Sequence, residues 1–446
     1  MQMADAKEDR LRTFLPASSL FLATAAFIIA KTGRDALFFE GRGLFQLPLV
    51  YMTIAMGALP LALIFVKAMK TWGARPARVG VLVFAAAVLG FATPFLTSGD
   101  SLLLLNIFIF IPAIFGILFA SLWLLATDIL EKTPKSEAAR SYSKIGASSL
   151  AGGMTGGLMA KGLAPFLHPK WLILLGAIVL LAVVGLVHFI HRRLPSNITT
   201  TKKTKQEEPP GWLEPFSNNY VRTLLLISMS GALAGLLIDF QFYAAATGAA
   251  MGMMGNANFF ANFYIMLNLG SLLLQLFATP MIQDKIGLRG GLMILPVALI
   301  GGATFVTTAA TALSRSVLRV TEGGLRSSIH RSIWEQAFIP VDSSDRSFVK
   351  IAVDGMGARI AEGIGATAIF FWLSQVAPGG ITVGPLDTRW MAWVTLATVI
   401  VWLIITQKLR SRAESVATQP LAEDAIECER FPDQCPCTTE LGKGIA

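Results

Sequence analysis

The feature that most constrains this chain is a succession of long apolar runs separated by short polar stretches. A helix needs about 20 mostly apolar residues to cross a bilayer, and we identify twelve runs close to or above that length. Hydrophobic residues make up 54% of the 446 residues, and charged residues only 15%. This balance excludes a disordered chain and a large soluble enzyme. The predicted class is an all-α polytopic membrane protein with twelve transmembrane helices.

The apolar runs fall into two sets of six, separated by a polar, basic and proline-bearing stretch at 191–219. The predicted spans of the first set are 14–39, 46–66, 79–96, 101–130, 144–166 and 171–190. Those of the second set are 220–245, 259–278, 291–309, 312–339, 348–376 and 390–405. We therefore predict an N-terminal six-helix bundle at 1–190, a cytoplasmic linker at 191–219, a C-terminal bundle at 220–408 and a disordered cytoplasmic tail at 409–446.

Lysine and arginine occur on alternate predicted loops, which gives the chain an orientation. They occupy the N-terminus, the loop from Lys67 to Arg78, the linker and the loop with Lys285 and Arg289, whereas 97–100 and 247–258 contain none. The positive-inside rule then places both termini in the cytoplasm, and we expect a multi-pass protein of a bacterial inner membrane. The net charge of +9 is a topology signal, so no nucleic-acid partner is predicted.

The two sets also show a weak internal repeat at the start of the fifth helix of each. The segment RSYSKIGASSLAGGMTGG begins at Arg140, and RSFVKIAVDGMGARIAEG begins at Arg346. Six positions correspond at a constant offset of 206 residues. Both helices enter from the cytoplasm, so we predict two parallel six-helix repeats. The glycines of the first segment predict close helix packing or a sliding contact, because a P-loop lysine and its Ser/Thr are missing.

The tenth predicted span carries five ionisable residues at intervals of four, three, four and four. They are Arg315, Arg319, Glu322, Arg326 and His330. At about 100° per residue they form a stripe about 80° wide, and each charge would cost at least about 2.5 to 3.5 kcal/mol in lipid. The stripe therefore predicts a cationic wall along a substrate path, with Glu322 separating the guanidiniums or exchanging protons. The alternative is a set of interhelical ion pairs, with Arg315 at the outer interface.

Other ionisable residues also lie inside predicted spans. Lys31 and Asp35 are one helical turn apart and able to pair, with Arg34 between them, although all three could instead snorkel at the interface. Asp239 is alone in its span, which predicts either a cation from another helix or a bound proton.

The eleventh predicted span combines charges with glycines. Asp354, Arg359 and Glu362 alternate with four glycines, which predicts tight packing with charges paired across the contact.

Three cysteines near the C-terminus form an incomplete metal site and are expected to be reduced thiols of the tail. We find no complete catalytic constellation, so neither an enzyme, a metal nor a cofactor is predicted.

Several stretches resemble the nucleotide (ATP/ADP-type) translocases and their bacterial relatives within the major facilitator architecture. They are KTGRDALFF with LPLVYMTIA, SLWLLATDIL with IGASSLAGGMTGG, FYIMLNLGSLLLQLFATP, and SIHRSIWEQAFIPVDSSDRSFVKIAVDGMGARIAEGIGA. The resemblance implies two six-helix bundles that rock about a central site lined by the first, fourth, seventh and tenth helices. It also implies a Lys-Glu pair for substrate handling, which here is Trp334 and Glu335. That departure from the family pattern argues against ATP/ADP exchange.

The stripe and the resemblance together predict two groups of site residues. The substrate-binding group is Lys31, Arg34, Asp35, Arg319, Glu322, Arg326, His330 and Glu335. The coupling or gating group is Asp128, Asp239, Asp354, Arg359 and Glu362. The predicted function is a secondary active transporter, with antiport implied by the resemblance, that moves an organic anion such as a nucleotide or another phosphorylated metabolite by alternating access. The alternative is a non-transporting membrane sensor or assembly partner with the same fold; the predicted partners are the lipid bilayer and the anion.

Overall fold

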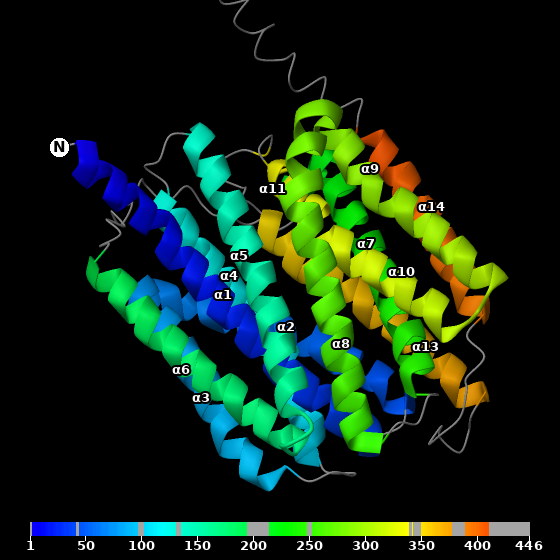
Figure 1. Ribbon diagram of the computed structural model, residues 1–446. Helices are drawn as coiled ribbons and strands as arrows, with labels where there is room; N and C mark the ends of the chain where they lie inside the picture. The colour runs from blue at the N-terminus through cyan, green and yellow to red at the C-terminus, as the bar shows by residue number, and fades with distance from the viewer. Residues whose placement is uncertain are drawn as a thin grey trace, which may run out of the picture.

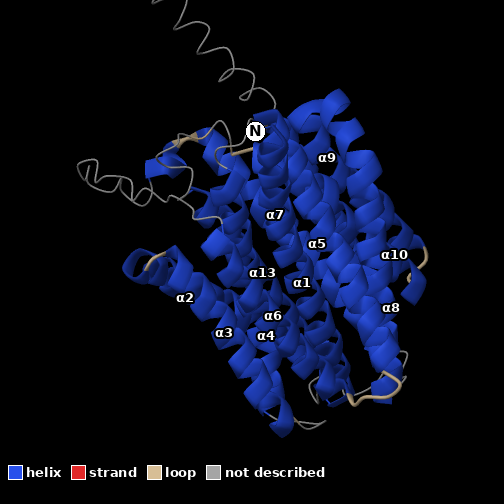
Figure 2. Ribbon diagram, turned by 60° about the vertical axis from the view of Figure 1, so that its left-hand side comes forward, coloured by secondary structure: helices blue, strands red, loops and turns tan. Residues whose placement is uncertain are grey.

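The computed structural model describes residues 2–41, 44–96, 102–130, 135–193, 214–247, 252–338, 341, 349–376 and 389–409. Within these ranges the chain is helical and contains no strand (Figure 2). A helix satisfies its backbone hydrogen bonds internally, which is why long apolar segments adopt this form in lipid. The all-α prediction is confirmed.

Each of the first six predicted spans corresponds to one helix. These helices are α1 (Gln2–Gly41), α2 (Leu47–Trp72), α3 (Ala74–Ala92), α4 (Leu102–Leu130), α5 (Lys135–Leu163) and α6 (Pro169–Arg193), with short 3₁₀ turns η1 (Leu44–Gln46) and η2 (Thr93–Phe95). Both α1 and α5 begin about two turns or more before their predicted spans. The stretches ahead of the apolar runs contain good helix formers such as Ala, Lys and Glu, so the helix extends into them. Gly73 separates α2 from α3 with φ of 91°, a conformation that only glycine adopts readily.

Where the structure describes it, the second set of six contains three π-helical segments. Its elements are η3 (Glu214–Ser217), α7 (Asn219–Thr247), α8 (Gly252–Leu273), η4 (Leu274–Ala278), α9 (Thr279–Thr308), α10 (Ala312–Leu325), η5 (Arg326–His330), α11 (Arg331–Gln336), η6 (Ile351–Gly357), α13 (Ala358–Val376) and α14 (Arg389–Lys408). The predicted tenth span is therefore α10, η5 and α11 in succession. The predicted loop with Lys285 and Arg289 is wrong in its local structure, because α9 already begins at Thr279 and these residues are helical.

Eight helices among the described residues are long and apolar enough to cross a membrane. They are α1, α3, α4, α6, α7, α8 with its η4 turn, α9 and α14. The less apolar α5, α10 and α13 pack against other helices of the protein, where glycines and charges meet protein rather than lipid. The chain is a multi-pass integral membrane protein.

Contacts between the two sets of helices follow a symmetric pattern. The second helix, α2, packs on the eleventh, α13, and the fifth, α5, packs on the eighth, α8. Figure 1 shows α5 and α8 side by side between the blue-to-cyan helices and the green-to-orange ones. If each helix of the first set is exchanged with its counterpart in the second set, α2 becomes α8 and α13 becomes α5. The α2–α13 contact then becomes the α8–α5 contact. This is the relation that two parallel six-helix repeats predict.

The glycines of α5 set how closely its neighbours approach. A Cβ on Gly152 would lie 2.1 Å from the carbonyl oxygen of Phe21 in α1, and a Cβ on Gly153 would lie 2.3 Å from Asn268 in α8. Glycine is therefore required on the face of α5 that meets the main chain of α1, whereas on the face that meets α8 a side chain would displace the amide of Asn268. The prediction of close helix packing for this segment is confirmed.

Among the described residues, the three largest clusters of buried apolar side chains are two separate cores and one seam. One core draws on α1, α3, α4, α5 and α6, and a second draws on α7, α9, α10, α11 and α14. A third cluster, rich in phenylalanine, joins α1, α2 and α4 to α7, α8, α13 and α14. We call this third cluster the aromatic seam. The limits at 190, 220 and 408 remain predictions, and the tail at 410–446 lies outside the described residues.

Candidate functional site

The arginine stripe of α10 is held by a single carboxylate in the helix itself. Glu322 is only 2% exposed and pairs with Arg319 three residues before it and with Arg326 four residues after it. Arg326 also donates through Nη2 to the carbonyl oxygen of Gly231 in α7, at 2.8 Å. A Cβ at Gly235 would lie 3.4 Å from both Arg326 and Glu322, which is ordinary van der Waals contact, so α7 packs directly against this pair.

Asp239 of α7 supplies a second carboxylate to the stripe. Its Oδ1 lies 2.6 Å from Nε of Arg319. Of the two alternatives for Asp239, the structure therefore shows a cation from another helix. The predicted cationic wall is therefore neutralised in this part, because Arg319 and Arg326 face two carboxylates, Asp239 and Glu322.

One end of the stripe departs from the predicted pattern. His330 is buried, stacks on Trp334 with 5.9 Å between ring centroids and meets Trp402 of α14 edge-on at 5.7 Å. The cause is η5, because a π turn holds more residues than an α turn and so breaks the four-residue register after Arg326. Arg315 lies in the first turn of α10 and is 9% exposed, and its predicted place at the outer interface stays a prediction.

The charges of α1 pair differently from the prediction. Asp35 pairs with its neighbour Arg34 and not with Lys31 one turn earlier. The Arg34 guanidinium donates through Nε to Asp35 at 2.8 Å and through Nη1 to the carbonyl oxygen of Phe108 at 3.3 Å, and lies 4.0 Å above the Phe108 ring. Both charged side chains are buried, Asp35 completely. The alternative of snorkelling at the interface is therefore wrong for this pair.

Asp35 also connects α1 to the second set of helices. The hydroxyl of Tyr264 in α8 donates to its Oδ2 at 2.6 Å, and that of Tyr243 in α7 lies at 3.4 Å. The Tyr243 ring in turn stacks on Phe39 of α1 at 4.7 Å, within the aromatic seam. A buried carboxylate of one half is thus satisfied by donors from the other half.

We expect Tyr264→Phe to destabilise the protein by about 1–3 kcal/mol, because a fully buried carboxylate loses its closest donor from another helix. The melting temperature of the detergent-purified protein should fall accordingly. Tyr142→Phe is the matched control, since its hydroxyl makes no hydrogen bond to any described residue. Equal melting temperatures for the two variants would contradict the assignment.

Lys31 differs from the other cations near it. Its Nζ lies 4.5 Å from the centroid of the Tyr264 ring and 5.9 Å from that of Phe27. Among the described residues it has neither an ion pair nor a hydrogen bond, although it is close enough to Arg319 and Asp239 for direct charge interaction. An ammonium above an aromatic face keeps part of its donor capacity for a ligand.

The two charged residues of α13 pair with each other, whereas Asp354 of the preceding η6 has its partner in α11. Arg359 Nη1 lies 2.5 Å from Glu362 Oε2, and Asp354 of η6 accepts a hydrogen bond from Nε1 of Trp334 at 2.7 Å. The prediction that these charges pair across the helix contact is wrong for the Arg359–Glu362 pair, because an i,i+3 partner is available locally. The predicted tight packing is confirmed by Gly357, whose Cβ would lie 2.3 Å from Leu225 of α7.

Nine ionisable side chains from α1, α7, α10, η5 and α13 lie close enough to one another to interact electrostatically. We define the central charged cluster as Lys31, Arg34, Asp35, Asp239, Arg319, Glu322, Arg326, Arg359 and Glu362. With every group ionised, five cations face four carboxylates, which leaves one positive charge. Lys31 is the cation without a carboxylate partner among the described residues.

Three predicted site residues with described side chains lie outside this cluster: His330, Asp354 and Asp128. Asp128 of α4 pairs instead with Arg78 of α3 at 2.5 Å, and the Arg78 side chain is fully buried. Glu335 belongs to α11, but its side chain lies outside the described part of the structure.

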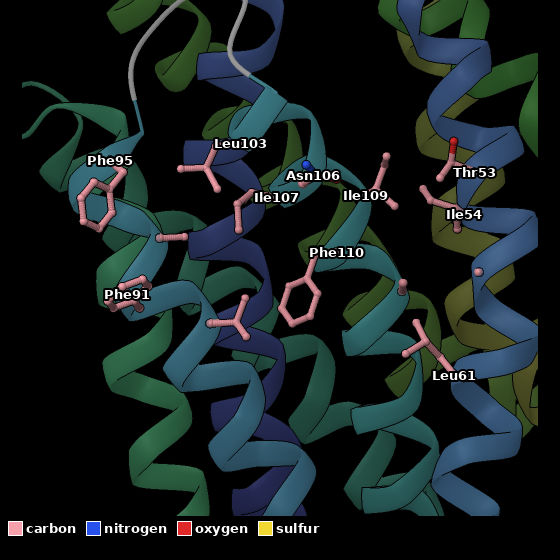
Figure 3. Close-up of a pocket in the computed structure, with 14 residues that line it drawn as sticks. Thr53, Ile54, Leu61, Phe91, Phe95, Leu103, Asn106, Ile107, Ile109 and Phe110 are labelled. Atoms are coloured by element: carbon pink, nitrogen blue, oxygen red, sulfur yellow. The ribbon is translucent and has the colours of Figure 1, made fainter.

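The larger of the two cavities described for this structure is not the site. It has a volume of about 510 Å³ and lies between α2, α3 and α4, with Thr53, Phe91, Asn106 and Phe110 among its lining (Figure 3). None of the predicted site residues lines it, and its wall is almost entirely apolar. A groove of this kind on a membrane protein offers no partner to a charged substrate.

The sequence reasoning missed Arg78, Tyr243 and Tyr264. The two tyrosines could have been noticed, because tyrosine in membrane proteins concentrates at the interfaces and these two lie within spans. The hydroxyl of a buried tyrosine usually needs a hydrogen-bond partner. Arg78 gave no such signal, since it belongs to a run of basic residues that was assigned to a loop.

Comparison with known proteins supports the fold. No protein-family model and no curated protein sequence matches this chain. The crystal structure of the nucleoside transporter NupG is 10% identical, with a TM-score of 0.61 over 89% of this chain and 98% of that one. The structure of a NupG mutant is 12% identical, with a TM-score of 0.60 over 90% of this chain and all of the other. The predicted polytopic, major facilitator-like fold is confirmed, whereas identity this low carries no substrate.

Proposed function

We propose that this protein is a secondary transporter that moves a small organic anion across the membrane by alternating access of its two six-helix halves. The observation that supports it is the central charged cluster, which gathers ionisable side chains from both halves between them. Ionisable groups at membrane depth are costly and usually mark a substrate or ion path. Lys31, the cation of this cluster that has no carboxylate partner among the described residues, gives the anion its anchor.

The charge balance favours a substrate with one negative charge. ATP and ADP, the substrates that the family resemblance implies, carry several charges, and binding them would demand more free cations than Lys31 alone. The nucleoside of NupG is neutral and would leave the Lys31 charge unanswered. A carboxylate, or a phosphate with one ionised oxygen, matches the cluster best.

The aromatic seam supplies one gate of the proposed cycle. It is built from the C-terminal part of α1, the N-terminal part of α2 and the facing ends of α7 and α8. With both termini in the cytoplasm of a bacterium, the seam closes the outer side of the inner membrane. Rocking of the halves would then have to separate Tyr264 from Asp35 before the cluster opens outward.

The extensive pairing of the arginines also fits the alternative function, a non-transporting sensor or assembly partner. A thermal-shift screen of the purified protein separates the two. We expect singly charged carboxylates such as benzoate, lactate or gluconate to raise the melting temperature more than ADP or uridine does, because a ligand that binds only the folded state stabilises it. Stabilisation by none of them, with no uptake into reconstituted vesicles, would favour the alternative.

We expect Lys31→Gln to weaken carboxylate binding by about 10- to 100-fold, because a charge-assisted contact contributes about 1.5–3 kcal/mol. Folding should be little affected, since Lys31 pairs with no carboxylate of a described residue. The measurement is the concentration dependence of the thermal shift. Lys161→Gln, an exposed lysine on α5, is the matched control. Unchanged affinity in Lys31→Gln would remove the proposed anchor.

A further inference from the structure

We propose that Asp239 is the proton-binding site of this transporter, and that a proton on Asp239 frees Arg319 to bind the anionic group of the substrate. This inference rests on the proposed function and names its coupling ion and its second substrate contact. It is carried by the different ways in which Asp239 and Glu322 hold the same arginine.

Glu322 is the fixed partner of Arg319. It is almost fully enclosed, it lies on the same helix, and it also receives Arg326, which is itself tied to the Gly231 carbonyl. Releasing Glu322 would break two ion pairs in an enclosed place. Arg319 therefore keeps this partner in every step.

Asp239 is the releasable partner. Its side chain is 23% exposed and belongs to a different helix, α7. Oδ1 is enclosed and lies within ion-pair distance of Arg319, yet it receives no well-aligned hydrogen bond from a described residue. Protonating Asp239 would cost one ion pair of poor hydrogen-bond geometry, and Arg319 would still be neutralised in part by Glu322.

Other titratable and charged groups face Asp239 from each side. They are Lys31 and Asp35 of α1, Tyr51 of α2, Tyr243 of α7, Arg319 and Glu322 of α10 and Glu362 of α13. Two of these are cations from opposite halves, Lys31 and Arg319. An anion that takes the place of the Asp239 carboxylate would therefore contact one cation of each half.

The exchange balances in charge and in protons. The proton comes from the aqueous side to which the cluster is open and binds a carboxylate oxygen of Asp239, which raises the charge of the cluster by one. A singly charged anion then binds between Lys31 and Arg319 and restores the original charge. When the anion leaves on the other side, Asp239 loses its proton there and pairs again with Arg319. One proton thus travels with each anion, in the same direction.

The test compares anion affinity as a function of pH in wild type and in Asp239→Asn, whose side chain imitates the protonated carboxyl. The probes are benzoate, lactate and gluconate, which stay ionised across neutral and mildly acidic pH. For wild type we expect affinity to fall about tenfold for each pH unit on the alkaline side, as linkage of one proton requires, and about one proton to be taken up per anion bound in weakly buffered solution. For Asp239→Asn we expect pH-independent affinity and no proton uptake. Glu40→Gln, an exposed carboxylate at the end of α1, should behave as wild type.

Different results overturn different claims. Binding without proton uptake in wild type, or unchanged pH dependence in Asp239→Asn, overturns the proton site and leaves the proposed function in place. Failure of all three probes to bind wild type overturns the proposed anion function itself. Since proton uptake is measured on wild-type protein, the inference is tested even if Asp239→Asn does not fold.

Discussion

Glu322→Gln is expected to destabilise the folded protein by about 3 kcal/mol, the lower end of the range for a broken buried ion pair, because Glu322 is buried whereas its partners Arg319 and Arg326 are partly exposed to solvent. Two guanidiniums, those of Arg319 and Arg326, would remain close together with only Asp239 to offset them. The amide oxygen of glutamine can accept a hydrogen bond from a guanidinium, but it carries no negative charge to neutralise the two arginines. The measurement is the melting temperature of the detergent-purified protein, together with the fraction that elutes as a monodisperse species.

A second substitution separates loss of charge balance from loss of shape. In Glu322→Gln combined with Arg326→Gln, Arg319 keeps the Asp239 partner and one uncompensated cation is gone, so part of the lost stability should return. Glu40→Gln controls for the chemical change on an exposed carboxylate of α1. A melting temperature for Glu322→Gln equal to that of Glu40→Gln would mean that Glu322 does not act as the buried partner of the two arginines.

The fold could be predicted from the sequence because each span is a local feature. A run of about 20 apolar residues is sufficient to identify a membrane helix, and eight of the described helices are of this kind. The helix ends could not be predicted in the same way. Helix continues into polar residues at the starts of α1 and α5, where hydropathy no longer reports on backbone conformation.

The candidate site could be predicted only as far as its contacts lie within one helix. The spacing of Arg319, Glu322 and Arg326 is enough to place them on one face, and the structure shows them paired. Their link to Asp239 joins residues 80 positions apart in sequence, on α7 and α10, and no periodicity within a helix can specify it. The bond from Tyr264 to Asp35 depends in the same way on how two halves pack.

His330 shows a different limit. The predicted stripe assumed a constant angle per residue, and this holds from Arg315 to Arg326. A π turn begins at Arg326, so His330 lies among Trp334 and Trp402 instead. Such a turn depends on packing against neighbouring helices and has no dependable signature in a single sequence.

We expect Gly152→Leu to destabilise the protein by about 3 kcal/mol or more, because overpacking against a rigid neighbour is costly. Even the first carbon of a side chain at this position would lie 2.1 Å from the carbonyl oxygen of Phe21, and main-chain atoms of α1 cannot rotate away. The α1 helix carries Lys31, Arg34 and Asp35, so its displacement would also disturb the central charged cluster. The measurements are the melting temperature and the yield of monodisperse protein.

Gly162→Leu is the matched control on the same helix. A Cβ at Gly162 would meet no atom within 4 Å, and the residue is exposed, so the added side chain can extend outward without displacing α1. The two variants have the same chemical change and differ only in the neighbour they meet. If both lowered the melting temperature equally, the cost would come from leucine in α5 itself. The close approach of α1 to α5, which positions the charges of the first helix between the halves, would then lack support.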